Sequence, residues 1–151
     1  VRTVQAICPN GSVAAFENAA CRFTYRHSVF EENGAAVLSA DFSLRRDDPA
    51  AIAARMEEYA ARRREKQPLE WPSAGSTFKR PQGAFAAALI DQCGLKGASV
   101  GGARVSEKHA GFVINAGGAT CADVLALTEK IIAVVREKTG YTLEREIRVV
   151  R

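Results

Sequence analysis

Hydrophobic and polar residues alternate in three short stretches of the first third of the chain, which is the period of a strand with one buried face. Residues 3–8 and 13–16 alternate on either side of Asn10 and Gly11, a pair typical of a tight turn, and so predict a β-hairpin. The alternation returns over residues 36–44, which predicts a half-buried strand.

A helical period begins after this strand. Asp48 and Pro49 favour a helix start, because Asp can cap free amides and Pro suits the first turn. The basic run 62–66 is expected to end the helix, where cations interact favourably with the helix dipole. The apolar stripe of this helix is expected to consist of Ile52, Met56, Tyr59 and Ala60.

Residues 67–83 interrupt the regular pattern. They contain three prolines, the only tryptophan and several small polar residues, a composition that predicts a loop. We expect this loop to join two domains, residues 1–70 and residues 71–151.

The second of these domains mixes helices with strands. Phe85 and Leu89 predict a short helix that ends at Gly94. Thr120, with Asp123 three residues later, predicts the start of a long helix that ends at Gly140. Strands are expected at residues 100–105, 112–115 and 143–150. With no internal repeat, the whole pattern predicts the α+β class.

Composition excludes several classes of protein. The 151 residues are 47% hydrophobic and 25% charged, which is typical of globular chains and excludes disordered and fibrous ones. The net charge of +4 is spread along the chain rather than gathered in a basic stripe, so no nucleic-acid partner is predicted. No apolar run is long enough to cross a membrane, and no signal segment opens the sequence.

The cysteines and the first residue add two expectations. Four cysteines without metal-ligand spacing predict reduced thiols in a cytoplasmic protein and no metal site. The chain begins at Val1 rather than Met, so we expect it to be a piece of something longer.

Candidate chemical residues also have ordinary structural interpretations. Ser76 follows Gly75 in the predicted loop, but a lone serine is usually a turn or cap residue, and no hydrolase motif surrounds it. Glu146 and Arg148 would share one face of the last strand, either as a solvated pair or as part of a site. Arg26 is by default an exposed loop arginine. The glycine clusters after residue 93 lack a phosphate-binding fingerprint and predict tight turns.

Five motifs in order change these interpretations, because together they are far more specific than any one of them. They are F-T-Y-R-H-S at 23–28, P-S-A-G-S-T-F-K-R-P at 72–81, G-L-K-G with G-G-A at 94–103, V-S-E-K-H-A-G-F-V-I-N at 105–115 and L-E-R-E-I-R at 143–148. In this order the chain resembles the UDP-N-acetylenolpyruvoylglucosamine reductase family over essentially its whole length. The uninterrupted stretch after Ser28 resembles the shorter subtype of that family.

The resemblance implies a reaction. Members use NADPH to reduce FAD, and then reduce UDP-N-acetylglucosamine enolpyruvate to UDP-N-acetylmuramate for the bacterial cell wall. It implies that Ser76 donates a proton to the substrate, and that Arg26 and Glu146 stabilise the intermediate. Such chemistry needs an acid on one side of the substrate and groups that hold its carboxylate.

The same resemblance implies the binding residues. Lys66, Gly75, Arg80, His109 and Arg148 are expected to bind substrate, and Tyr25 with Arg26 to contact the cofactor. Arg80 replaces an Asn found in some relatives, and a guanidinium can still hold a diphosphate.

The resemblance also implies a missing part. The family's glycine-rich FAD loops precede the Tyr-Arg motif, and none stands before Val1. We therefore expect the chain alone to bind FAD poorly and to lack turnover, with the N-terminal segment as a partner in trans. The alternative from another class is a module that binds a UDP-sugar or a partner without catalysis.

Overall fold

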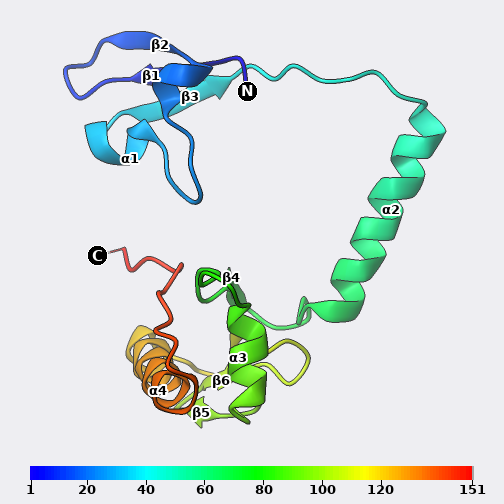
Figure 1. Ribbon diagram of the computed structural model, residues 1–151, viewed down its shortest axis with the longest axis vertical. Coiled ribbons are helices and arrows are strands. Elements are labelled where there is room, and N and C mark those ends of the chain that lie inside the picture. Colours follow the sequence, from blue (N-terminus) through cyan, green and yellow to red (C-terminus); the bar gives the residue numbers. More distant parts are fainter. Residues whose placement is uncertain (151) are drawn as a thin grey trace. The chain divides into compact units, whose positions relative to one another are not determined.

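The computed structural model describes residues 1–150, and the chain divides into two compact units, Val1–Ile52 and Ala53–Arg151. Each unit has its own antiparallel sheet and its own helices (Figure 1). The α+β class is therefore confirmed.

The first unit is a three-stranded sheet with the strand order β2-β1-β3. It consists of β1 (Thr3–Ile7), β2 (Val13–Glu17), the short helix η1 (Asn18–Cys21), α1 (Val29–Asn33) and β3 (Ala36–Ala40). The predicted hairpin is confirmed: the Gly11 amide donates to the Cys8 carbonyl at 2.8 Å, and Gly11 has a φ of 82°. Val4 and Ala6 on the central strand are buried.

The third strand differs from its prediction. It ends at Ala40 instead of residue 44, and it is exposed rather than half-buried. Val37 and Leu38 are neighbours, so they point to opposite faces, yet both are more than half exposed. The strand lies at the sheet edge and is paired only with β1, and no part of the first unit buries its apolar side chains on either face.

Helix α2 (Pro49–Lys66) begins as predicted, since the Ala51 amide donates to the Asp48 carboxylate at 3.0 Å. The structure leaves the predicted apolar stripe of this helix uncovered. Met56 and Tyr59 are more than half exposed, and no residue of the helix is buried. The helix is held locally by ion pairs such as Arg62 with Glu58, one turn apart.

The second unit packs two helices on a four-stranded sheet with the strand order β4-β7-β6-β5. It contains β4 (Ser73–Ser76), α3 (Ala86–Gln92), β5 (Ser99–Val100), β6 (Ala103–Val105), β7 (Phe112–Asn115) and α4 (Cys121–Thr139). Its fully buried core includes Ile90, Val105, Leu127, Ile131 and Val135. Thr120 and Asp123 form the predicted capping box, and Gly140 ends α4 with a φ of 76°.

Three predicted elements of this unit are corrected. Strand β4 lies inside the segment predicted as a loop. Residues 100–105 are two strands of a hairpin, because Gly101 and Gly102 turn the chain between β5 and β6. Residues 143–150 form no strand and pair only through the isolated bridge between Phe78 and Arg145. Pro81 lies just beyond this bridge and has no amide with which to extend a ladder.

Candidate functional site

Ser76 is presented by a β-bulge at the end of β4. Ser73 pairs with Ile114 and Ser76 pairs with Phe112, so two residues of β4 lie opposite the single residue Val113. Gly75 is one of the two and has a φ of 81°, a backbone region that glycine adopts without steric cost. Such a bulge re-aims the next side chain, and Ser76 is exposed.

Thr77 anchors the strand immediately after Ser76. Its side chain is buried, and its Oγ1 accepts a hydrogen bond from the Val113 amide at 2.9 Å. Its own amide donates to the Gly111 carbonyl at 2.9 Å. Thr77 therefore fixes the bulged strand to the segment that leads into β7.

The C-terminal segment is held against the other edge of the same short stretch. The Glu146 amide donates to the Thr77 carbonyl at 2.9 Å, and the Lys79 amide donates to the Glu144 carbonyl at 2.8 Å. These bonds place Glu146 directly opposite Thr77, next to Ser76 in the chain. The structure therefore brings the backbones of two predicted catalytic residues, Ser76 and Glu146, to one place.

Arg145 fixes the C-terminal segment from its other face. Its Nε donates to Thr128 Oγ1 on α4 at 2.7 Å, and its guanidinium pairs with Glu129. Thr128 is fully buried, so the contact reaches into the core. The backbone at Glu146 is thus held by its own bond to the segment after β4 and, through the neighbouring Arg145, by a contact with α4.

His109 belongs to the turn that precedes β7. Its Nδ1 accepts the Gly111 amide at 3.1 Å, so the neutral ring carries its proton on Nε2. The ring packs edge-to-face on Phe112 with centroids 5.0 Å apart, and Phe112 is the cross-strand partner of Ser76. The buried hydroxyl of Ser106 accepts the His109 amide at 3.3 Å and so helps fix the turn.

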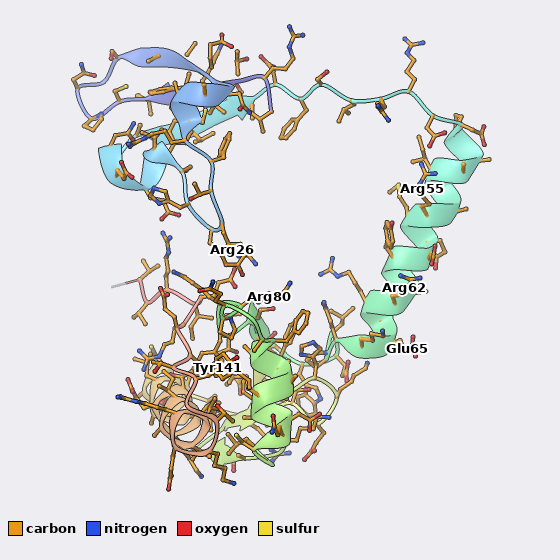
Figure 2. The ribbon with its side chains drawn as sticks, viewed as in Figure 1. Arg26, Arg55, Arg62, Glu65, Arg80 and Tyr141 are labelled. Atoms are coloured by element: carbon orange, nitrogen blue, oxygen red, sulfur yellow. The ribbon has the colours of Figure 1, made fainter. Side chains whose placement is uncertain are left out.

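The three basic residues that were predicted to bind substrate lie in different segments of the chain. Arg80 stacks over the Phe85 ring at 4.0 Å and is labelled beside β4 in Figure 2. Lys66 lies in the last turn of α2, and within residues 1–150 no hydrogen bond or ion pair joins it to the Ser76 segment. Arg148 is exposed in the C-terminal segment, two residues beyond Glu146.

A pocket of about 340 Å³ borders the bulge. Its walls are mostly apolar side chains from the end of the sheet, the start of α4 and the C-terminal segment, including Pro72, Thr77, Val113, Val124 and Ile147. Sequence reasoning missed Thr77 and Val113 as parts of this region. No local signal distinguishes them, because their contact depends on the cross-strand register.

Tyr25 and Arg26 form the tip of a two-residue turn in the first unit. Thr24 and His27 exchange backbone hydrogen bonds of 3.1 and 3.3 Å around them. Arg26 has a φ of 56°, which is strained for a side chain of this size and costs about 1–2 kcal/mol. Its guanidinium lies 5.7 Å from the centre of the exposed Tyr25 ring, and Figure 2 shows Arg26 at the tip of this turn.

The base of this turn is fixed by charge. The His27 ring lies 2.8 Å from the Glu32 carboxylate, which also pairs with Arg22. The hydrogen bond to His27, followed by the charge of Arg22, lowers the pKa of Glu32 below its ordinary value. These contacts lie on the exposed side of the first unit and anchor the two ends of the turn segment to each other.

Two negative findings apply to the described part of the chain. Among residues 1–150, no three His, Cys, Asp or Glu side chains are grouped so that they could hold a metal ion. In the same residues, no helix has both the length and the apolar character needed to span a bilayer.

Comparison with known proteins gives a consistent result. Residues 67–150 match the family model of the C-terminal domain of UDP-N-acetylenolpyruvoylglucosamine reductase. Reductases of that name from Syntrophomonas wolfei and Caldanaerobacter subterraneus subsp. tengcongensis are 48% and 50% identical over 99% of this chain and 50% of their own length. The chain therefore spans about half the length of the curated relatives it matches.

A solved structure extends this likeness to the fold. The crystal structure of the reductase from Thermus caldophilus superposes with a TM-score of 0.82 at 32% identity, over 98% of this chain and 52% of that chain.

Proposed function

Because the chain belongs to the UDP-N-acetylenolpyruvoylglucosamine reductase family, we propose that it carries the substrate side of the NADPH-driven reduction of UDP-N-acetylglucosamine enolpyruvate to UDP-N-acetylmuramate. The observation that supports this best is the bulge at Gly75. It exposes a serine hydroxyl on a fixed strand, and the same strand pairs with the segment that contains Glu146.

The cofactor of the proposed reaction is FAD, which when bound and reduced by NADPH would supply the hydride for the β carbon of the substrate. The fit with this chain is partial. The exposed phenol ring and guanidinium at the Tyr25–Arg26 tip fit the polar edge of a flavin or a substrate carboxylate. They would form only one side of a cofactor site, so the isolated chain is proposed to bind FAD poorly and to lack turnover.

Ser76 is proposed to donate the proton that the α carbon needs. A serine hydroxyl is a weak acid in water, but an enolate-like carbanion is strongly basic, and a fixed donor loses little entropy in the transfer. The bulge and the buried Thr77 hold the Ser76 backbone in place. After the transfer, a nearby positive charge would stabilise the serine oxygen.

Arg26 and Glu146 are proposed to stabilise the negative charge that develops on the substrate carboxylate. A guanidinium forms paired hydrogen bonds to a carboxylate, and a carboxyl group can stabilise an anion by donating its own proton. The hydrogen bond of the Glu146 amide to Thr77 and the contact of the preceding Arg145 with α4 support this role, because a stabilising group must hold its position before charge develops.

The remaining predicted residues are proposed to bind the UDP-sugar. Arg80 and Lys66 supply cations for the diphosphate, and Arg148, Gly75 and His109 lie on or beside the segments that position Ser76 and Glu146. The neutral His109 ring presents an Nε2 proton as a hydrogen-bond donor.

The proposed partner of this chain is the part of a relative that it does not contain. The edge strand β3 exposes Val37 and Leu38 on opposite faces, a pattern typical of a strand covered on both sides. A second polypeptide that supplies the remaining half of a reductase, in the cytoplasm, would cover these side chains and complete the FAD site.

The test joins the two halves. The part of the Caldanaerobacter relative that has no counterpart here is fused in front of this chain, and NADPH oxidation is followed with the enolpyruvyl substrate. The fusion is expected to bind FAD and reduce the substrate. Ser76→Ala should lower substrate reduction by about 10²- to 10⁴-fold, the range for loss of a general acid, while NADPH still reduces the flavin.

Ser99→Ala is the matched control, because this exposed serine lies on β5, at the opposite edge of the same sheet from β4. It should leave the rate unchanged. A fusion that binds FAD and the UDP-sugar but never transfers hydride would contradict the proposal and favour a binding module.

A further inference from the structure

Thr77 is the buried residue between the two predicted catalytic positions. Three of its polar groups are used, and they join β4 to two other segments: the amide bonds Gly111 and the hydroxyl bonds Val113, both at the start of β7, and the carbonyl bonds Glu146 in the C-terminal segment. The hydroxyl contact is the one that a side-chain substitution can remove.

This hydroxyl acts where the ladder is irregular. The register shifts between Ser73 and Ser76, and Val113 is the residue opposite the bulge. A buried amide without an acceptor costs about 1–3 kcal/mol, so the Val113 amide needs the Thr77 hydroxyl. The side chain thus stabilises a bulge that would otherwise leave part of the strand unpaired.

We propose that Thr77 is a positioning residue, whose hydroxyl locks the bulged strand on β7 and thereby sets the distance between Ser76 and Glu146. The inference rests on the proposed function. If the hydroxyl is removed, only the amide bond to Gly111 still holds the Thr77 backbone beside β7, so the strand can shift there and the Thr77 carbonyl shifts with it. The Glu146 amide, which donates to that carbonyl, then loses its fixed place.

The first test uses the 151-residue chain and needs no cofactor. Amide hydrogen exchange is measured by NMR for Val113 and Glu146. Thr77→Val keeps the shape but removes the acceptor, and should speed exchange at both amides by at least about 10-fold. Thr77→Ser keeps the hydroxyl and should restore the protection. Unchanged exchange at Glu146 in Thr77→Val would overturn the inference.

The second test uses the fusion with the Caldanaerobacter part. Thr77→Val is expected to lower kcat by about 10- to 100-fold, the loss typical of a small misplacement. The KM for the enolpyruvyl substrate and flavin reduction by NADPH should stay the same, and Thr77→Ser should recover kcat. A rise in KM with unchanged kcat, or a failure of Thr77→Ser to recover kcat, would contradict a positioning role.

Two controls separate this inference from other failures. Thr139→Val removes a hydroxyl that donates to the Val135 carbonyl within the same unit, far along the chain from Ser76, and should leave kcat unchanged. If Thr77→Val does not fold, Thr77→Ala replaces it in both tests with the same expected losses. If the unmodified fusion reduces no substrate, the proposed function fails, whereas the exchange experiment still decides whether Thr77 fixes Glu146.

Discussion

The substitution Gly102→Ala tests whether the glycines around β5 and β6 serve packing. A Cβ at Gly102 would lie 2.3 Å from the Gly117 carbonyl oxygen and 2.4 Å from the Ala119 amide nitrogen. Both distances are about 1 Å inside the 3.4 Å at which ordinary contact begins, and both atoms belong to the backbone. The loop before α4 must therefore shift, and overpacking of this kind costs about 1–3 kcal/mol.

Gly140→Ala is the matched control, because it isolates the conformational cost. A Cβ there meets nothing within 4 Å, but the φ of 76° disfavours any side chain. A left-handed residue costs about 1–2 kcal/mol, and alanine recovers part of this by restricting the unfolded chain. We expect the free energy of unfolding to fall by about 1 kcal/mol for Gly140→Ala and by about 2–3 kcal/mol for Gly102→Ala.

The assay is urea unfolding followed by tryptophan fluorescence. Trp71 is the only tryptophan and belongs to the second unit, so its signal reports on the unit that contains both glycines. The urea concentration at the unfolding midpoint should be highest for the unmodified chain, lower for Gly140→Ala and lowest for Gly102→Ala. The dependence of the unfolding free energy on urea should be similar in all three. A Gly102→Ala midpoint equal to that of the unmodified chain would refute the packing explanation and reopen a ligand-binding role for this turn.

Two further predictions concern the same unit. The pKa of Asp123 is lowered chiefly by the hydrogen bond from the Thr120 amide, so its ionised form stabilises the fold above the ordinary value of 3.8, and this contribution is lost as the pH falls through the folded pKa. Unfolding curves at several pH values should therefore show Asp123→Asn destabilised at neutral pH and the difference shrinking below about pH 4; a difference that grows in acid would contradict the assignment. Leu127→Ala should lower the free energy of unfolding by about 2–5 kcal/mol, because Leu127 is fully buried. Met56→Ala, on the exposed face of α2, should lower it by less than about 0.5 kcal/mol. Equal losses in the two variants would contradict the exposure of that helix.

The local signals in the sequence predicted element ends well. The pair Thr120 and Asp123, the turn at Gly11 and the stop at Gly140 all depend on contacts within a few residues, and each is confirmed. The motifs also located Ser76 and Glu146 in the segments that the fold brings together. These patterns reflect hydrogen bonds between residues close in sequence, and the surrounding fold does not alter such bonds.

Other elements could not be predicted, because their state depends on distant partners. The stripe on α2 has the right period, yet a period cannot tell whether anything covers the face, and Met56 is exposed. Residues 143–150 alternate like a strand, but the partner segment is too short for more than one bridge, at Phe78. The anchor at Thr77 depends on a register shift that no local pattern reveals.

The proposed catalytic residues lie where the local rules of structure are broken. Ser76 follows a bulge at Gly75, and Arg26 has a left-handed backbone although it is not glycine. Irregularities of this kind cost stability and persist only when surrounding contacts hold them, as Thr77 holds the bulge and His27 closes the turn. A regular strand at residues 73–77 would remove the shift that re-aims Ser76. The bulge at Gly75, a register shift that the sequence pattern does not reveal, is therefore the feature that would allow Ser76 to reach a substrate.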